Sequence, residues 1–265
     1  MLAKGVNSMF GLIRNEIYKT FHLKKFQLFM LVIVTAEIAF IMQIKASPSA
    51  TGLVSMNGQS FPYSLLTVLP YITVIFMAIF ISDTWIEEYR SGTFKLVLLR
   101  PVRRASLLHA KIIALLLSVI ILIAFTILSA YITGTIAFGW GEYASIEGVN
   151  YSYGTGLGIT MQSALTMVYP AFGFGVLITF VALLTDDWGI TIGSSLGLMQ
   201  LLQMLEINTR IRPYSIMYLM RTFHKELIEG LVPEKIIIRL TTLALYIVLF
   251  YLGSRIIIKR KDMMF

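Results

Sequence analysis

Residues 112–133 read IIALLLSVIILIAFTILSAYIT, a run of 22 residues without a charged side chain. A helix of about 20 apolar residues is long enough to cross the hydrocarbon core of a bilayer. Five further apolar runs lie outward from this one, at residues 26–44, 64–82, 161–184, 190–205 and 236–258. The sequence therefore predicts an all-α membrane protein with six transmembrane helices, in which the run at 190–205, short and rich in Gly and Ser, is the weakest.

Composition agrees with this fold class. Of the 265 residues, 57% are hydrophobic and 14% are charged, and the mean hydropathy is +0.79. Soluble domains carry about twice that share of charge, so the composition argues against a soluble enzyme. With no cysteine, the chain has no disulfide, thiolate nucleophile or Cys-ligated metal. We expect one permease-like domain over residues 1–265, without repeats, and we expect no nucleic acid, cofactor or metal as ligand.

The distribution of basic residues predicts the topology. Lys and Arg gather before the first run, between the second and third runs, and after the last run, whereas residues 134–160 contain neither. Because cytoplasmic loops carry the excess of Lys and Arg, both termini are expected in the cytoplasm and residues 134–160 outside. The basic segment 210–239 disagrees with this arrangement. An alternative topology, in which the fifth run dips in and returns, would place that segment inside and the C-terminus outside.

Several motifs have competing interpretations. Residues 10–26 have a basic amphipathic pattern, which favours an interfacial helix before the first span. Glu37, in the middle of the first run, is expected to face a partner, a cavity or water, because an ionised carboxylate is costly there. It is either a structural residue or part of a translocation path. Asp186 and Asp187 are expected to form a turn or a helix cap.

The small residues Gly189, Gly193 and Gly197 recur every four positions and predict close helix packing, within the chain or in a dimer. Ser195 in the same stretch fits G-x-S-x-G, but the strand that this nucleophile motif requires is not expected here. The three histidines are far apart in sequence, so a metal site is not expected. The chain also lacks G-x-x-x-x-G-K-[ST], so it has no P-loop with which to hydrolyse ATP.

The connection between the second and third runs carries the most specific pattern, DTWIEEYRSGTFKLVLLRPVRR at residues 83–104. Acidic residues precede a glycine, and a short apolar segment then ends at a proline, as expected for a short helix across the cytoplasmic surface. Such a helix could dock into a cleft of a partner protein. The predicted contact residues are Glu87, Glu88, Gly92, Thr93, Arg100, Pro101 and Arg104.

This connection resembles the membrane subunits of type-2 ATP-binding-cassette (ABC-2) exporters. Their pattern of Glu, Gly-Thr, Pro, a basic residue and Lys matches the positions Glu88, Gly92, Thr93, Pro101, Arg104 and Lys111 here. The resemblance implies a permease in the bacterial cytoplasmic membrane that pairs with a second copy or a related permease. It further implies that two separate cytoplasmic ATPase subunits bind ATP and Mg²⁺ and act on a coupling helix within residues 88–101.

The substrate branch is less defined, because residues 206–213 (EINTRIRP) depart from the proline-rich segment of polysaccharide and drug exporters. The small size is similar to permeases for antimicrobial-peptide immunity or antibiotic efflux. Three other functions remain open: an ion-coupled secondary transporter or channel that uses Glu37, an intramembrane hydrolase that uses Ser195, and a membrane scaffold without transport.

Overall fold

The computed structural model describes residues 2–22, 24–46, 56–90 and 104–260. In chain order, these residues form the following elements: α1 (Leu2–His22), α2 (Lys24–Ala46), α4 (Phe61–Leu65), α5 (Leu69–Ile81), the π-helix η1 (Ser82–Glu87), α6 (Glu88–Arg90), α8 (Arg104–Phe138), β1 (Ala144–Ile146), β2 (Val149–Tyr151), α9 (Tyr153–Thr185), α10 (Trp188–Leu205), the 3₁₀ turn η2 (Arg212–Tyr214), α11 (Ile216–Ile228) and α12 (Pro233–Arg260).

The prediction of an all-α membrane protein is confirmed. Five helical segments of the described chain are long and apolar enough to span a membrane: Lys24–Ala46, Leu69–Glu87, Ala105–Phe138, Tyr153–Thr185 and Pro233–Arg260. They correspond to five of the six predicted runs. The fifth run, 190–205, forms α10, which does not belong to this set, so the sixth crossing stays a prediction.

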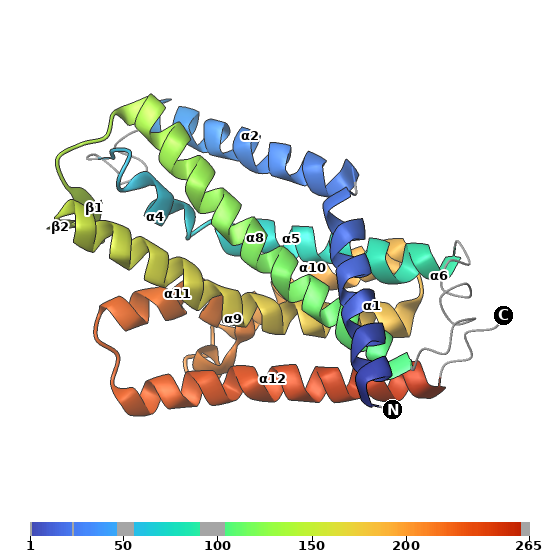
Figure 1. The fold of residues 1–265 in the computed structure, drawn as a ribbon. Helices are drawn as coiled ribbons and strands as arrows, with labels where there is room; N and C mark the ends of the chain where they lie inside the picture. Colours follow the sequence, from blue (N-terminus) through green and yellow to red (C-terminus); the bar gives the residue numbers. More distant parts are fainter. Residues whose placement is uncertain (1, 23, 47–55, 91–103, 261–265) are drawn as a thin grey trace.

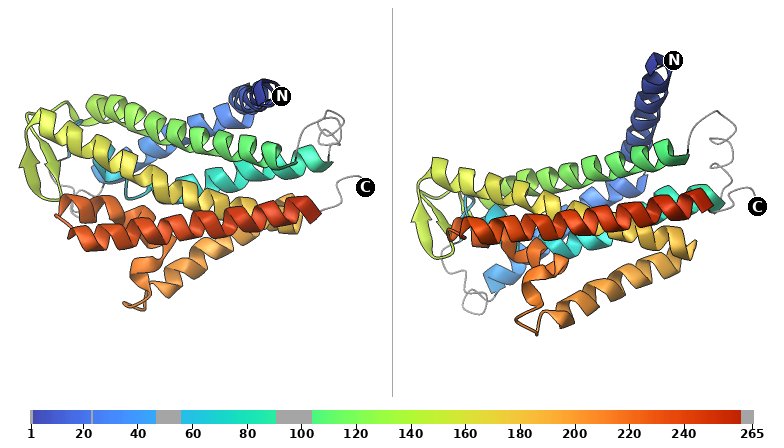
Figure 2. Two further views of the ribbon diagram at one scale, coloured as in Figure 1. Left: turned by 60° about the horizontal axis from the view of Figure 1, so that its bottom comes forward. Right: turned by 90° about the horizontal axis from the view of Figure 1, so that it is seen from below.

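The helices run lengthwise between two ends of a bundle (Figures 1 and 2). We call one the loop end, where α6 ends, α8 begins and α12 terminates. At the opposite, hairpin end, β1 and β2 join α8 to α9. Helix α1 crosses the bundle at the loop end and packs on α8, so both described chain termini lie at this same end.

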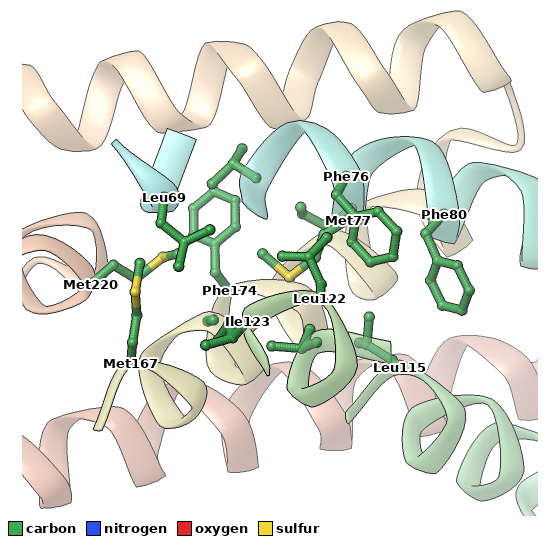
Figure 3. Close-up of a cluster of buried hydrophobic side chains, with 14 of the residues drawn as sticks. Leu69, Phe76, Met77, Phe80, Leu115, Leu122, Ile123, Met167, Phe174 and Met220 are labelled. Atoms are coloured by element: carbon green, nitrogen blue, oxygen red, sulfur yellow. The ribbon is translucent and has the colours of Figure 1, made fainter. Parts of the chain in front are cut away.

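Helix α9 occupies the centre of the bundle and packs against α5, α8, α10, α11 and α12. Figure 3 shows the core, in which Met77, Leu115 and Phe174 meet from three different helices. Gly175 on α9 permits this close packing, because a Cβ atom there would lie 2.9 Å from Leu115 and 3.0 Å from Met77. In contrast, α12 exposes a long apolar face, of which Leu245 and Leu249 are 64% and 65% exposed. Such a face suits contact with lipid acyl chains.

Hydropathy predicted a helix from residue 64, but the continuous helix of this run begins only at residue 69. Helix α4 ends at Leu65, and α5 begins at Leu69, with Pro70 in its first turn. Proline lacks a backbone N–H and has a fixed φ, so it fits the first turn of a helix better than its interior. At the other end the helix passes beyond residue 82, through η1 and α6, to Arg90.

The predicted outer loop 134–160 is largely ordered. Helix α8 extends to Phe138, α9 begins at Tyr153, and a two-stranded antiparallel hairpin lies between them, with Ile146 paired to Val149. The two turn residues, Glu147 and Gly148, have φ values of 49° and 79°. Positive φ at both central residues is the requirement of a type I′ hairpin turn. The prediction of a loop here missed this hairpin.

Candidate functional site

The loop end contains a buried cluster of two carboxylates and two lysines, which we call the charged cluster: Glu16, Lys19, Glu88 and Lys111. The Lys111 Nζ atom lies 2.8 Å from Glu88 Oε2 and 3.2 Å from Glu16 Oε2. Lys19 Nζ lies 3.2 Å from Glu88 Oε1 and 3.6 Å from Glu16 Oε1. Each carboxylate thus contacts both lysines, and the cluster joins α1, α6 and α8.

The cluster is largely removed from water, so its charges depend on one another. The Lys111 side chain is 1% exposed, and its ammonium group also donates to the Thr84 carbonyl oxygen at 2.5 Å. Burial acts to raise the pKa of Glu88, but the charges of Lys111 and Lys19 outweigh it and hold that pKa below its usual range. Burial likewise acts to lower the pKa of Lys19, and Glu88 and Glu16 reverse the shift upward. Glu88 and Lys19 are therefore stabilised in their charged forms by their partners in the cluster.

The π-helix η1 sets the direction of the carboxylates. In an α-helix, side chains five positions apart point about 140° away from each other. In a π-helix the hydrogen bonds join residues five positions apart, so these residues lie nearly on one face. Asp83 and Glu88 are such a pair, and both face the junction of α1 and α2, where each contacts a lysine. The π turn therefore aligns both carboxylates toward the same junction.

Further polar contacts connect this segment to α10. Asp83 Oδ1 accepts hydrogen bonds from Lys25 Nζ at 2.7 Å and from Trp188 Nε1 at 3.2 Å. Asp187 pairs with Arg90 at 2.5 Å and accepts from the Ile190 backbone N–H at 2.9 Å, which caps α10. The predicted helix-cap role of Asp187 is confirmed. The segment between α5 and residue 90 is thus attached to α1, α2, α8 and α10.

A cavity of about 490 Å³ opens beside the charged cluster. The first turn of α2, the end of α1 and the segment 83–88 form its walls, and the lining includes Tyr18, His22 and Glu87. Glu87 is exposed there, whereas its neighbour Glu88 is half-buried in the cluster. The loop end therefore presents a cavity lined by charged and polar residues at the root of the connection between α6 and α8.

The other predicted contact residues of this connection are described only in part. Gly92, Thr93, Arg100 and Pro101 lie outside the described residues. Arg104 begins α8. Of the seven predicted residues, the structure brings Glu88 into the charged cluster and leaves Glu87 at its rim. The predicted coupling helix within residues 88–101 therefore stays a prediction.

Glu37 is buried inside the first spanning helix, 2% exposed. Its carboxylate lies 2.6 Å from Ser129 Oγ and 3.0 Å from Thr133 Oγ1, both on α8. These partners satisfy the carboxyl group with hydroxyl groups in place of a cation. A small cavity of about 30 Å³, lined by Ile33, Phe40 and Leu69 among others, adjoins it. The expectation that Glu37 faces a partner is confirmed, and the partner is α8.

The glycine stripe of α10 faces away from the rest of the bundle. Gly189, Gly193 and Gly197 are exposed, and a Cβ atom at Gly193 or Gly197 would meet nothing within 4 Å among the described residues. Within the described chain, then, the stripe packs against no second helix. The stripe predicts close helix packing either within the chain or in a dimer. Since the first is not found among the described residues, packing in a dimer stays the prediction.

Two other motifs take structural roles. Ser195 lies inside α10, is fully buried and donates to the Thr191 carbonyl oxygen at 2.6 Å, a geometry unlike that of an exposed nucleophile on a strand-to-helix turn. His109 contacts the Tyr251 hydroxyl, and His22 contacts the Tyr18 carbonyl oxygen. Among the described residues, no group of three potential metal-ligating side chains comes together.

The hairpin end holds a second polar group around His224. Its ring packs edge-on against Tyr63 and is 2% exposed, and neither ring nitrogen has a hydrogen-bond partner among the described residues. Burial, with a smaller contribution from Lys225, lowers the pKa of His224 to about 4, against a weaker upward effect of Glu147. Glu147 itself pairs with Lys225 at 2.6 Å and accepts from the Tyr63 hydroxyl.

This end also contains the basic segment that disagreed with the predicted topology, and three of its cations are paired. Arg221 pairs with Glu206, and Arg239 Nε lies 3.2 Å from Glu226 Oε2. Together with the pair between Lys225 and Glu147, three cations of the segment are neutralised by carboxylates of the same end. The topology of this segment stays a prediction, because the positive-inside rule counts Lys and Arg and not the net charge.

Sequence reasoning missed Glu16 and Asp83 as parts of the site. Glu16 is the first carboxylate of the chain and stands alone among basic residues up to position 36. An isolated acid three positions before Lys19 in an amphipathic basic helix was the available signal. Asp83 gave no such signal, because its partners Lys25 and Trp188 lie 58 and 105 positions away.

The architecture and the buried clusters define a multi-pass α-helical membrane protein. The chain belongs to the family described as "Protein of unknown function (DUF2705)", whose model matches residues 25–264. The match includes nearly all of every candidate spanning helix and excludes α1 with its contacts to the cluster. No curated protein matches the chain.

Proposed function

We propose that this protein is the membrane-spanning permease subunit of an ATP-binding-cassette exporter of the ABC-2 type. Two separate ATPase subunits bind ATP and Mg²⁺ and supply the energy. The chain resides in the bacterial cytoplasmic membrane with both termini in the cytoplasm, forms six crossings with α10 as the fifth, and pairs with a second copy or a related permease through the exposed glycine face of α10.

The charged cluster is the observation that carries the proposal. Glu88 and Lys111 belong to the sequence pattern of the ABC-2 resemblance, and their side chains lie 2.8 Å apart although the residues are 23 positions apart in sequence. The cluster attaches the root of the 91–103 connection to α8 and α1, and Asp83 and Arg90 attach it to α2 and α10. A displacement of this connection by an ATPase would therefore act on four helices at once.

The first test is purification of the tagged chain in mild detergent from its native membranes, followed by mass spectrometry of stoichiometric partners. A P-loop ATPase at a one-to-one ratio with the permease is the expected result. A homogeneous chain that transports a solute alone in liposomes would refute the proposal. The substrate class that we propose, an antimicrobial peptide or antibiotic, is then tested by growth with and without the complex.

A variant tests the coupling surface without disturbing the charged cluster. Glu87 is exposed at the cavity beside Glu88, so we expect Glu87→Gln to lower transport-coupled ATPase activity several-fold while the melting temperature stays unchanged. The matched control is Glu142→Gln, which changes an exposed carboxylate at the hairpin end. Equal ATPase activity in both variants would remove Glu87 from the coupling surface.

Glu37 supports a second candidate function, an ion-coupled secondary transporter or channel. The supporting observation is a carboxyl group buried inside a spanning helix, held by two hydroxyl groups beside a small cavity. Carboxyl groups in such positions often bind the coupling ion. In liposomes without ATP, this function requires ion-driven uptake by the wild type and its loss in Glu37→Gln. Uptake that requires ATP and the partner subunits would exclude it.

A further inference from the structure

The turn between α10 and α11 exposes both charged and apolar side chains. Ile207 is 84% exposed, Ile211 is 45% exposed, and Arg210 and Arg212 are exposed between and after them. The turn is well built: the Asn208 carbonyl oxygen accepts from the backbone N–H groups of residues 211 and 212, and its side chain accepts from the N–H of residue 210. The exposure therefore belongs to a defined surface.

The two arginines of this turn differ from the other cations of the same end. Arg221, Lys225 and Arg239 each pair with a carboxylate, whereas Arg210 and Arg212 have no carboxylate partner among the described residues. Arg212 instead lies over the Tyr218 ring, 4.6 Å from its centre, which holds its guanidinium group in place. Two guanidinium groups two positions apart in one turn, neither paired with a carboxylate among the described residues, attract an anion.

The position of the turn indicates which kind of anion the two arginines would meet. Helix α10 begins at the loop end, where Asp187 pairs with Arg90, and has 18 residues, so it rises about 27 Å. That length is slightly below the roughly 30 Å of a hydrocarbon core. Figure 2 shows the turn standing out from the flank of the bundle. With α10 crossing the membrane as proposed above, the turn lies near the boundary between acyl chains and headgroups, where arginine side chains reach lipid phosphates and isoleucines contact acyl chains.

We propose that Arg210 and Arg212 form a binding site for the phosphate group of anionic lipid headgroups and hold the α10–α11 turn at the membrane interface. Guanidinium groups bind phosphate oxygens through two parallel hydrogen bonds. We expect the pair to bind an anionic headgroup better than a zwitterionic one, because the ammonium group of a zwitterionic headgroup repels the two arginines. Ile207 and Ile211 add the apolar contact that a soluble phosphate lacks. The site rests on the crossing of the membrane by α10 that the proposed function includes, and not on transport itself.

The test compares melting temperatures of the purified full-length protein in detergent with added phosphatidylglycerol, phosphatidylcholine or inorganic phosphate. For the wild type we expect phosphatidylglycerol to stabilise more than phosphatidylcholine, and inorganic phosphate to have little effect. The double variant Arg210→Gln/Arg212→Gln should lose at least half of the difference between the two lipids. Its melting temperature in phosphatidylcholine should equal that of the wild type, which shows that it folds.

The control is Lys235→Gln, an exposed cation at the first turn of α12, which should retain the lipid difference. If Lys235→Gln lost the difference between the two lipids equally, the effect would depend only on the total positive charge of the protein, and the proposed site would be overturned. Equal stabilisation by inorganic phosphate would overturn the lipid as its ligand. A change of the double variant from dimer to monomer in native mass spectrometry, with the lipid difference intact, would assign the turn to contact with a second copy instead.

Discussion

At the loop end, four charged side chains share one buried cluster, whereas at the hairpin end the cations pair one by one and a buried histidine lacks any hydrogen-bond partner among the described residues. In the shared cluster each charge depends on all the others, so the loss of one leaves a net buried charge. Separate pairs, each with its own partner, depend less on each other, so the loss of one charge affects one pair. The comparison indicates that removing a single charge should destabilise the loop end more than the hairpin end.

The largest expected effect comes from removing the most buried member of the charged cluster. Lys111→Met leaves Glu16 and Glu88 facing each other with Lys19 alone to compensate them. Breaking a buried ion pair from one side costs about 3–5 kcal/mol, so we expect a large fall in melting temperature. Lys24→Met, which changes an exposed lysine of the same end, is the control. Equal melting of the two variants would refute the dependence of the cluster on Lys111.

The two ends should also respond differently to acid. The pKa of His224 is about 4 in the folded protein against 6.5 when unfolded. The unfolded chain therefore binds the proton first, and the stability from neutral His224, complete above pH 6.5, is lost as the pH falls toward 4. Linkage gives a loss of about 2 kcal/mol by pH 5. Glu88 has a lowered pKa, so its contribution is lost only as the pH falls below about 4.5.

Melting between pH 7.5 and 5 distinguishes the two ends. His224→Phe should flatten the pH dependence over this range, because the aromatic contact with Tyr63 stays and the titrating group is removed. His22→Gln, at an exposed histidine of the loop end, should leave the wild-type slope. An unchanged slope in His224→Phe would show that acid sensitivity arises elsewhere.

A smaller effect is expected in the hairpin turn. Gly148 has a φ of 79°, and a Cβ atom there would meet no described atom within 4 Å. Gly148→Ala therefore tests backbone strain without a clash, and a left-handed conformation costs a residue with a side chain about 1–2 kcal/mol. Gly154→Ala, at an equally open glycine in the first turn of α9, should be neutral or stabilising. Equal melting temperatures of the two variants would argue against the type I′ turn.

The smallest effect should come from Lys25, which pairs with Asp83 in the π segment that precedes Glu88. Its side chain is 55% exposed, against 1% for Lys111. Exposed ion pairs contribute about 0–1 kcal/mol, so Lys25→Met should change the melting temperature only slightly. A loss as large as that of Lys111→Met would mean that exposure does not decide the difference between the two pairs.

The sequence predicted the elements whose signal is local. The apolar runs predicted α2, α10 and α12 to within three residues at each end and the C-terminal end of α9 to within one, whereas α8 extends beyond its run by eight and five residues. Glu88 entered the site through its place in a spaced pattern. Glu16, Asp83 and the pairing of Arg221 could not be found in this way, because their partners come from segments distant in sequence or from a turn without a pattern.

The geometry of two other elements also escaped prediction. The hairpin turn contains Glu147 before its glycine, in place of the usual Asn or Asp, so its left-handed conformation was not evident. A π turn has no composition of its own, because it differs from an α turn by one residue of spacing. The alignment of Asp83 with Glu88 therefore required the structure.

The spacing of Asp83 and Glu88 across the π turn bears on which insertions and deletions this family can tolerate. Loss of one residue within Ser82–Glu87 would restore α-helical spacing and rotate the helix before the deletion by about 100° relative to the helix after it. Either Asp83 would leave Lys25 and Trp188, or Glu88 would leave Lys19 and Lys111. Among homologous chains, the number of residues between these two acids should accordingly vary less than the lengths of the surface turns.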